Sequence, residues 1–513
     1  MRHPHRLLAL LLLPAPLGLA AQSTAPPAPS AQAAARTITA EDIRRRIGII
    51  ADDSMRGRDT PSPELEKVAA YIAGEYRRLG LKPAGDSGGF LQRYSLDRVQ
   101  VVAESSIAFL HGGGDATLNF GKDFVFADNM FESGDYAGAL VLLSGPVGGA
   151  LTADTAAVAG KMVVVTSGPR NRVERQRVLS WHPAGIVLIT PVPDSIWAQV
   201  VSRNTRPQLR DPSRQVGGPV ILGVRLASFQ PIVTRLGGDL SATQNATTFA
   251  VKPLGDAQLH VHARIQAVER NSAPNVVAIL EGSDPQLKSQ YVVFSAHMDH
   301  IGVAGPRGSG GCRAQGADSI CNGADDDGSG TAAVVDLAQA FVKLNPRPKR
   351  SLIFLNVSGE EKGLWGSAYF ADHPAVPVSD IVADLNIDMI GRNWKDTIVA
   401  IGKEHSDLGA TLNRVAAAHP ELNMHAIDDI WPQENFYFRS DHFNFARKGV
   451  PILFFFSGTH PDYHRPGDSV DKIDAEKESR ITQLIFFLGL DVANAPERPK
   501  WNPDSYKRIV MGQ

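Results

Sequence analysis

The second half of the chain alternates short apolar runs with segments that have helical spacing. From Asn275 onward, apolar runs that predict strands lie at residues 275–280, 291–296, 351–357, 381–387 and 451–456. Runs with so few polar interruptions are typical of parallel strands that are buried on both faces. The pattern therefore predicts an α/β domain with a doubly wound, mostly parallel sheet and helices on both faces.

Helical patterns also lie ahead of this domain. Residues 40–51 and 63–79 have apolar positions at helical spacing, and Ser62 is placed to cap the second of them. We assign both helices to the main domain. That domain is then expected to comprise residues 37–120 and 255–495, with residues 496–513 as a C-terminal tail that carries no functional signal.

Between residues 121 and 254 the pattern changes to short β-type runs separated by Gly and Pro, for example at 138–143, 161–165 and 185–189. This predicts a small β-rich α/β domain inserted into the first. The segment has no concentration of His, Asp or Glu. Its expected role is therefore to frame a substrate cleft, with a purely stabilising lobe as the alternative.

Residues 1–21 have the features of an export signal: a basic start, an apolar stretch and small residues at a cleavable end. A membrane anchor is disfavoured, because the apolar stretch is shorter than the roughly 20 residues that span a bilayer and is interrupted by Pro14 and Pro16. Residues 22–36, rich in Ala, Pro, Ser and Gln, are predicted to form a disordered linker. We expect a periplasmic or secreted protein with no membrane attachment after the signal is removed.

The composition is that of a folded globular protein, with 43% hydrophobic, 21% charged and 7% aromatic residues. A length of 513 residues exceeds what one core normally supports, which agrees with more than one domain. The formal net charge of -2 leaves no strong field of either sign. Nucleic acid and anionic membrane surfaces are therefore poor candidates as partners, and nothing indicates the oligomeric state.

Cys312 and Cys321 are the two cysteines of the chain. Because exported proteins meet an oxidising environment, these nearby residues are candidates for a small local disulfide. A metal role is the alternative, although two thiols without a second pair are weak evidence for a site of their own.

Several of the predicted strands end at residues that ligate metals or transfer protons. In an open α/β sheet, ligands bind beyond the carboxyl ends of the strands, so these side chains are expected to meet at one site. A further contribution is a run of three aspartates in the turn-rich stretch 322–330. The side chains in question are His297, Asp299, Glu360, Glu361, Asp388 and His464, together with Asp325, Asp326 and Asp327.

Imidazole and carboxylate ligands together favour zinc, or a similar divalent ion, over magnesium. Two histidines and three carboxylates can hold two ions if one carboxylate bridges them, and a water between the ions then loses its proton more easily. Of the adjacent Glu360 and Glu361, one can ligate while the other stays free to accept that proton. Asp299, two residues after His297, is placed to hold the tautomer of that imidazole.

At these residues the chain resembles the M28 family of zinc peptidases. The resemblance is strong over residues 275–493 and weak over 37–120, and the inserted segment looks like the protease-associated domain that some members carry at this place. The motifs that carry it are Ser295-Ala-His-Met-Asp-His-Ile-Gly302, Asn322-Gly-Ala-Asp-Asp-Asp-Gly-Ser-Gly-Thr331, Gly359-Glu-Glu-Lys-Gly-Leu-Trp-Gly-Ser367, Asn386-Ile-Asp-Met-Ile-Gly391 and Tyr463-His464.

The resemblance implies a role for each candidate. It makes Asp326 the bridge between two zinc ions and Glu360 the general base, and it leaves the other two aspartates of the triplet as turn or supporting residues. One zinc would be completed by His297 and Asp388, and the other by Glu361 and His464.

Two other histidines compete for the last position. His460 is the less favoured alternative to His464, because the Arg-Pro-Gly-Asp468 segment that follows His464 completes the family's pattern. His442, in a segment that is also similar to the family, is expected to be structural or to line the cleft wall.

The resemblance implies an aminopeptidase that removes N-terminal residues from peptides. A carboxypeptidase or dipeptidase on the same scaffold is an alternative, for which Arg439 is a candidate to bind a substrate carboxylate; a surface or structural role for this residue is equally open. Tyr437 is a candidate to stabilise the oxyanion of the tetrahedral intermediate. Trp431, Phe436 and Phe438 line the pocket or belong to the core.

Two further alternatives lie outside this activity. A glutaminyl cyclase type of relative uses a single zinc, and the complete set of ligands here argues against it. A non-catalytic zinc-binding ectodomain would have no need of Glu360, because a structural site does not require an unliganded carboxylate beside the metals.

Overall fold

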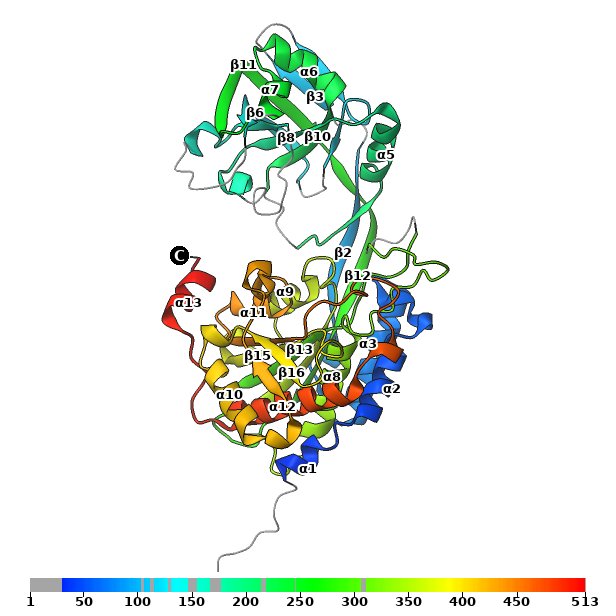
Figure 1. Cartoon of the computed structure of the whole chain (residues 1–513), viewed down its shortest axis with the longest axis vertical. Helices are drawn as coiled ribbons and strands as arrows, with labels where there is room; N and C mark the ends of the chain where they lie inside the picture. The colour runs from blue at the N-terminus through cyan, green and yellow to red at the C-terminus, as the bar shows by residue number, and fades with distance from the viewer. Residues whose placement is uncertain are drawn as a thin grey trace, which may run out of the picture.

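The computed structural model describes residues 30–102, 106–110, 115–127, 131–145, 155–166, 177–213, 218–244, 246–305 and 311–512. The predicted export signal at 1–21 lies outside the described residues, as do residues 22–29 of the predicted linker. The chain forms two lobes, and the long strands β2 (Leu91–Val101) and β12 (Ile265–Leu280) run from one lobe into the other (Figure 1).

The larger lobe is built on a sheet with the strand order β17-β16-β18-β15-β13-β14-β12-β2-β9, and β1 pairs with β12 beside it. Besides β2 and β12, its strands are β1 (Lys82–Pro83), β9 (Gln208–Arg210), β13 (Tyr291–His297), β14 (Ser351–Val357), β15 (Ile381–Ile387), β16 (Thr397–Ile401), β17 (His425–Ile427) and β18 (Ile452–Phe456). Strands β14, β13, β15 and β18 form a parallel block at its centre.

The α/β class with helices on both faces is confirmed, but the parallel part of the sheet is smaller than predicted. The run at 275–280 was expected to be parallel, whereas β12 pairs antiparallel with both β14 and β2. An apolar run reports burial on both faces of a strand, and a layer of helices on each face buries a strand whatever its direction. The apolar pattern therefore does not reveal whether β12 runs parallel or antiparallel to its neighbours. Only the strand pairing in the tertiary structure shows this.

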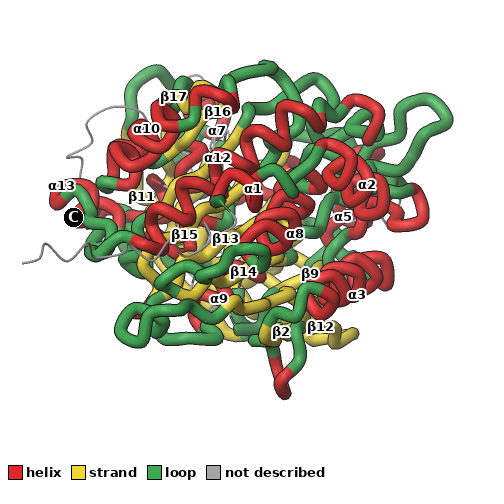
Figure 2. Tube along the Cα trace, turned by 90° about the horizontal axis from the view of Figure 1, so that it is seen from below, coloured by secondary structure: helices red, strands yellow, loops and turns green. Residues whose placement is uncertain are grey.

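Helices cover both faces of this sheet, and successive residues of a strand point to opposite cores. Leu352 and Phe354 of β14 join one core, and Ile353 and Leu355 join the other. Figure 2 shows α8 and α12, which contact each other, lying across the strands. The first face carries α1 (Ala31–Ala35), α2 (Ala40–Ile50), α3 (Pro63–Arg78), α8 (Gly328–Phe341), α10 (Leu408–Ala418) and α12 (Ala475–Asn494), and the second carries α9 (Trp365–Asp372), α11 (His442–Ala446) and α13 (Pro503–Ile509).

Both ends of the described chain are ordered, the first of them against the prediction of a disordered linker. Part of the expected linker is helical, because Ser30 caps α1 and the small side chains of Ala34 and Ala35 are buried in the first core. In the expected tail, Trp501 donates a hydrogen bond from Nε1 to the Gly449 carbonyl at 2.9 Å, and α13 packs on the second core. Within the described residues, no helix combines the length and the apolar character needed to cross a membrane.

The smaller lobe is a second sheet with the order β4-β3-β11-β6-β7-β8-β10-β5. Its elements are β3 (Ser106–Leu110), β4 (Ala116–Asn119), β5 (Phe124–Phe126), β6 (Gly134–Ser144), β7 (Met162–Val165), β8 (Gly185–Thr190), β10 (Val220–Arg225) and β11 (Ala250–Ala263), with α5 (Asp194–Asn204), α6 (Leu226–Arg235) and α7 (Leu240–Gln244). Strands β3, β4 and β11 lie partly or wholly beyond the expected limits of 121 and 254, so this lobe is larger than predicted. Conversely, β9 belongs to the sheet of the larger lobe.

A buried arginine joins three helices of the larger lobe. Arg46 of α2 is fully buried, and its Nε lies 3.0 Å from Asp336 Oδ1 of α8. It also forms a short ion pair with Glu75 of α3 and donates a hydrogen bond to Gln339 at 2.9 Å. Because a buried guanidinium is costly unless its donors are paired, these contacts hold α2, α3 and α8 in one arrangement.

Glu75→Gln is expected to lower the free energy of unfolding by about 2 kcal/mol at pH 7. Burial opposes the ionisation of Glu75, but Arg78 and Arg46 outweigh it and lower its pKa to about 2. A carboxylate whose pKa is lower in the folded state stabilises the protein above its unfolded pKa, and this contribution is lost as the pH falls towards the folded pKa. Urea unfolding of both proteins between pH 7 and pH 2.5 should show their difference shrinking with acidification.

Glu66→Gln is the matched control, since Glu66 pairs with Arg93 at 2.8 Å but both side chains are more than a third exposed. Its effect should stay below about 1 kcal/mol. If Glu75→Gln changes the free energy of unfolding as little as Glu66→Gln does, or if its effect does not depend on pH, the stabilising role of the ionised Glu75 is contradicted.

Candidate metal centre

The carboxyl ends of the parallel strands bring the predicted ligands together. His297 ends β13 and is buried, and its Nε2 lies 3.3 Å from Asp326 Oδ1 and 3.7 Å from Asp388 Oδ1. On the other side of the ring, Nδ1 lies 3.1 Å from the carbonyl oxygen of Asp299 and 3.6 Å from its carboxylate. The imidazole therefore presents Nε2 to the two carboxylates, with Asp299 behind it.

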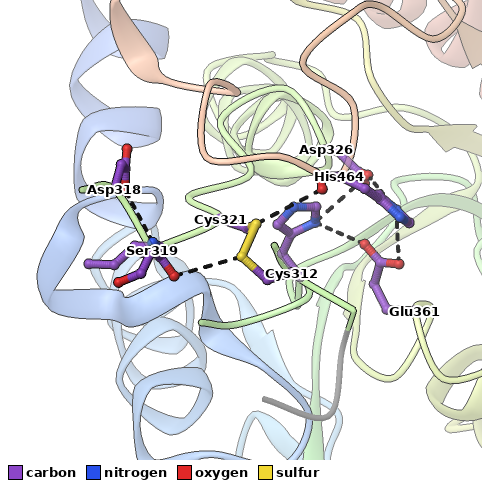
Figure 3. The surroundings of a disulfide bond; sticks show 9 residues. Cys312, Asp318, Ser319, Cys321, Asp326, Glu361 and His464 are labelled. Carbon is purple, nitrogen blue, oxygen red and sulfur yellow. Dashed lines mark hydrogen bonds and ion pairs between the residues drawn. A yellow bond between two sulfur atoms is a disulfide. The ribbon is translucent and has the colours of Figure 1, made fainter. Parts of the chain in front are cut away.

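A second group of ligands meets the first at Asp326. His464 Nε2 lies 3.2 Å from Asp326 Oδ2 and 3.2 Å from Glu361 Oε2 (Figure 3). Since Asp326 Oδ1 faces His297 and Oδ2 faces His464, the carboxylate of Asp326 lies between the two groups. All five predicted ligands thus lie in one place, and the arrangement of Asp326 is the one that a bridging ligand needs.

His300 belongs to this site although the sequence reasoning did not single it out. Its ring is fully buried, and Nδ1 lies 2.8 Å from Glu361 Oε1 and 3.7 Å from Asp326 Oδ2. The donor atoms of His300, Asp326 and Glu361 lie within 4.8 Å of one another, as do those of His297, Asp326 and Asp388. A signal was present, because the first motif contains a second histidine three residues after His297.

The donor set fits zinc. Asp326 Oδ2 and Glu361 Oε1 are buried and have no well-oriented hydrogen-bond donor among the described residues, so they have capacity for a cation. Buried carboxylate oxygens without partners are strongly unfavourable unless a positive charge lies beside them. Imidazole nitrogen and carboxylate oxygen together are ligands that zinc accepts in catalytic sites.

The charges of the site shift the pKa of its carboxyl groups in different directions. Burial raises the pKa of Glu360 well above its usual range, and the negative charges of Glu361, Asp441 and Asp388 add to this while His297 opposes it. Burial also opposes the ionisation of Asp326, but His300, His297 and His464 lower its pKa well below the usual range. Asp326 is thereby kept ionised, and Glu360 is disposed to accept a proton.

Arg58 connects the loops that carry the ligands, and it too was missed by the sequence reasoning. Its guanidinium is fully buried and donates to the carbonyls of Met298 at 2.9 Å, Gly323 at 2.7 Å and Asp326 at 3.2 Å, with a further short bond to Asn322. One side chain thus ties the loop after His297 to the loop that holds Asp326. No sequence pattern marks it, because an arginine in a short loop is usually exposed.

Three further side chains hold the ligand loops in position. Asp327 accepts hydrogen bonds from the amides of His297 at 3.2 Å, Gly330 at 2.8 Å and Met389 at 3.1 Å. Asp468 accepts from the Asp326 amide at 3.0 Å, and Ser440 donates to Asp388 Oδ2 at 2.8 Å. The ligand geometry therefore depends on amides and side chains from several loops at once.

Left-handed backbone conformations gather around the centre. The non-glycine residues Arg58, Leu364, Met389 and His464 have φ values of 38°, 61°, 57° and 57°. Each such residue costs about 1–3 kcal/mol unless its surroundings impose the conformation. Two of these conformations set the position of a predicted ligand, because Met389 directly follows Asp388 and His464 is itself a predicted ligand.

The structure places the remaining predicted residues away from the ligands. Tyr437 is buried in the second core, with its ring 4.5 Å from that of His405, and among the described residues no contact joins it to the five predicted ligands. Arg439 lies at the surface, 3.7 Å from Glu434 and over the ring of Phe436. Among the described residues, neither side chain has a hydrogen bond or ion pair to a predicted ligand.

The two competing histidines have partners of their own. His442 is buried, its Nε2 lies 2.8 Å from the carbonyl oxygen of Tyr437, and burial lowers its pKa to about 3. His460 Nε2 lies 3.3 Å from Asp325 Oδ2, next to the centre. His464, and not these two, faces Asp326 and Glu361.

Tyr463 packs on a predicted ligand, and the buried Asp441 lies within the electrostatic range of the centre. The ring of Tyr463 stacks on His464 with 3.9 Å between centroids, and burial together with the charges of Asp326 and Glu361 raises the pKa of its hydroxyl. Burial raises the pKa of Asp441 to about 7, with His297 opposing and Asp299 and Asp388 adding to the shift. The Tyr-His pair was visible as a motif, but nothing in the sequence showed that the tyrosine ring packs on the ligand.

Cys312 and Cys321 form a disulfide beside the centre, which settles the alternatives for these two residues. Cys321 Sγ lies 4.0 Å from the carbonyl oxygen of His464, so the cross-linked loop borders a predicted ligand (Figure 3).

Fold and site together describe an α/β domain in which two groups of histidine and carboxylate side chains, a candidate metal centre, lie at the carboxyl edge of the sheet. Residues 275–488 match the model of Peptidase family M28. Over these residues the chain is similar to this family, as the motifs indicated.

Relatives share this domain at low identity. The chain is 26% identical over 242 residues to a probable leucine aminopeptidase of Trichophyton verrucosum, covering 45% of this chain and 62% of the relative. It is 26% identical over 248 residues to aminopeptidase YwaD of Bacillus subtilis, covering 46% of this chain and 48% of the relative. The chain thus spans roughly half to three fifths of the length of these relatives.

A solved structure shares the fold over nearly the whole chain. The aminopeptidase from Aneurinibacillus sp. strain AM-1 aligns with a TM-score of 0.51 and 18% identity, covering 92% of this chain and 98% of that one.

Arg58→Lys is expected to lower the free energy of unfolding by roughly 3 kcal/mol and to weaken zinc binding about tenfold. A lysine cannot present the planar fork of donors that reaches the carbonyls of both loops, so buried acceptors lose their partners. Urea unfolding and a zinc titration of the metal-depleted protein measure the two effects. Arg44→Lys, at an exposed position of α2, is the control, and equal behaviour of the two variants would refute the role of Arg58.

Proposed function

We propose that this protein is an exported zinc-dependent aminopeptidase that hydrolyses the N-terminal peptide bond of its substrates. The observation that carries the proposal is the carboxylate of Asp326, which lies between His297 and His464. The neighbouring Glu360, next to the predicted ligand Glu361 in the chain, has no hydrogen-bond or ion-pair partner for its carboxylate among the described residues. The match to the M28 family and the names of the relatives support it.

Two zinc ions are proposed, both held by the residues described above. His297, Asp326 and Asp388 would hold one, and Asp326, Glu361 and His464 the other. When bound, the ions would supply Lewis-acid chemistry that polarises the carbonyl of the scissile bond and acidifies a water. His300 would support the second site through Glu361, from which its Nδ1 lies 2.8 Å.

Glu360 is proposed as the general base. Its backbone amide donates to Asp299 Oδ1 at 3.3 Å, so the loop is fixed, and within the described part of the chain its carboxylate has no hydrogen-bond or ion-pair partner. The side chain would take a proton from the attacking water and deliver it to the nitrogen of the leaving amine. The raised pKa of Glu360 favours the first of these steps, because it makes the carboxylate a stronger base.

Aminopeptidase activity is preferred to carboxypeptidase activity for an electrostatic reason. The free amine of a peptide is a cation, and Glu360 and Asp441 are carboxyl groups close to the centre that are not assigned to a zinc ion. Arg439, the arginine considered for a substrate carboxylate, is directed to Glu434 and Phe436 instead. A dipeptidase, which also requires a free amine, stays within the proposal.

Two further parts of the proposal concern the remaining segments. Export is supported by the disulfide, because such bonds persist in oxidising compartments, and the destination is proposed as periplasmic or extracellular. The inserted lobe, proposed as a protease-associated-like domain, would frame the substrate cleft. In support, a pocket of about 500 Å³ is lined by Asp211 and Ser213 of the inserted segment and by Leu364 and Phe438 of the larger lobe.

Glu360→Gln is expected to keep two zinc equivalents while its kcat falls by about 10²–10⁴-fold, because the amide cannot accept the proton. Zinc content by elemental analysis and hydrolysis of an aminoacyl chromogenic substrate measure the two effects. Glu361→Gln is the matched comparison, since loss of a ligand should remove metal as well as activity. A fully active Glu360→Gln variant would show that the proposed base is wrong.

Blocking the substrate amine should abolish hydrolysis. A peptide with a free N-terminus should be cleaved from that end, whereas its N-acetylated counterpart should be cleaved at least about 100-fold more slowly, because it lacks the cation that the carboxylates attract. Mass spectrometry of the products identifies the end that is attacked. Faster release of the C-terminal residue from the acetylated peptide would favour the carboxypeptidase alternative.

A further inference from the structure

A pocket of about 540 Å³ opens directly beside the metal centre. Its wall includes His464, so it shares a predicted ligand with the site of hydrolysis. Arg313, Gln315, Tyr463 and Arg465 contribute polar side chains to the same wall. A group bound here is therefore next to the reacting part of a substrate.

The pocket is lined by cationic side chains that have no carboxylate partner among the lining residues. Two arginines line it, no carboxylate does, and within the described residues neither Arg313 nor Arg465 has an ion pair. Two other cationic side chains differ in this respect, because Arg392 and Lys472 both form ion pairs with Asp462, at 2.9 and 3.0 Å. Unpaired arginines that share one concave wall are suited to bind a carboxylate, which accepts charge-assisted hydrogen bonds from the guanidinium.

Both arginines are attached to parts of the chain that the centre holds in position. Arg465 directly follows His464, whose imidazole lies between Asp326 and Glu361. Arg313 directly follows Cys312, which is cross-linked to Cys321 beside the His464 carbonyl (Figure 3). The backbone that carries each arginine is thus held near the metal ligands, which keeps both exposed guanidinium groups within reach of the pocket.

We infer that this pocket binds a carboxylate of the substrate, and that the enzyme prefers peptides with a carboxylate next to the hydrolysed bond. The inference rests on the proposed peptidase function and adds a substrate class to it. One residue of extended peptide spans about 3.3–3.6 Å, so the carboxylate belongs to a residue adjacent to the scissile bond. It comes either from an acidic side chain or from the free C-terminus of a dipeptide.

Two pairs of peptides distinguish these sources. Leu-Glu-amide and Leu-Gln-amide differ in the side-chain carboxylate, and Leu-Leu and Leu-Leu-amide differ in the terminal carboxylate. The zinc-loaded wild type should hydrolyse the charged member of at least one pair with a kcat/KM about tenfold higher, mainly through a lower KM. Arg313→Gln and Arg465→Gln should remove most of this preference and leave kcat/KM for the uncharged members within about twofold.

Arg347→Gln is the matched control, because Arg347 is exposed and precedes β14 at the end of the sheet opposite the ligands. This variant should keep the preference of the wild type. Equal kcat/KM values within both pairs for the wild type, or a preference that survives both pocket variants, would overturn the inference while leaving the peptidase function intact.

Failure of the peptidase function itself has a different signature, in which the wild type hydrolyses none of the four peptides. Calorimetric titration of the zinc-loaded Glu360→Gln variant, with and without Arg465→Gln, then tests the pocket without turnover. Binding of Leu-Glu-amide about tenfold tighter than Leu-Gln-amide, lost with Arg465→Gln, would support the carboxylate pocket. Equal binding of the two peptides would overturn it.

Discussion

Like-charged carboxylates packed at one end of a sheet repel each other, and the larger lobe is arranged around this constraint. Asp326, Glu361 and Asp388 lie together with Glu360, and burial of so much negative charge is unfavourable without compensating cations. Histidine side chains face the carboxylates from three directions, from His297, His300 and His464. The fit to two zinc ions follows from the same requirement, because cations between the groups would relieve the repulsion.

The loops that carry these side chains have no regular structure to hold them, so buried polar side chains hold them instead. Arg58 satisfies carbonyls of two ligand loops, and Asp327 accepts amides from three segments that meet at the centre. Asp468, four residues after His464, accepts the amide of the central ligand Asp326. Each loop is thereby fixed relative to the others, which explains how left-handed conformations at Met389 and His464 are maintained.

Much of the fold was predictable because strands and helices of this lobe have strong local patterns. The runs at 351–357 and 381–387 coincide with β14 and β15, and Ser62 caps α3 as expected. The failures concern relations between distant segments. The antiparallel direction of β12, the outer strands of the inserted lobe and the packing of α1 and α13 all depend on partners far away in the sequence, which a local pattern does not contain.

The sequence by itself determined which chemistry the centre offers, since ligand types and strand ends are local properties. These local signals marked the candidate residues, and the resemblance to the M28 family then selected Asp326, Glu361 and His464 from among their neighbours. The structure brings these three together with His297 and Asp388. Only the tertiary structure decided the direction in which other side chains point. It turned Tyr437 into the core, placed Tyr463 against His464 and brought His300 and Arg58 to the centre. The physical reason is that side-chain direction is set by packing between loops and layers, which meet only in the folded chain.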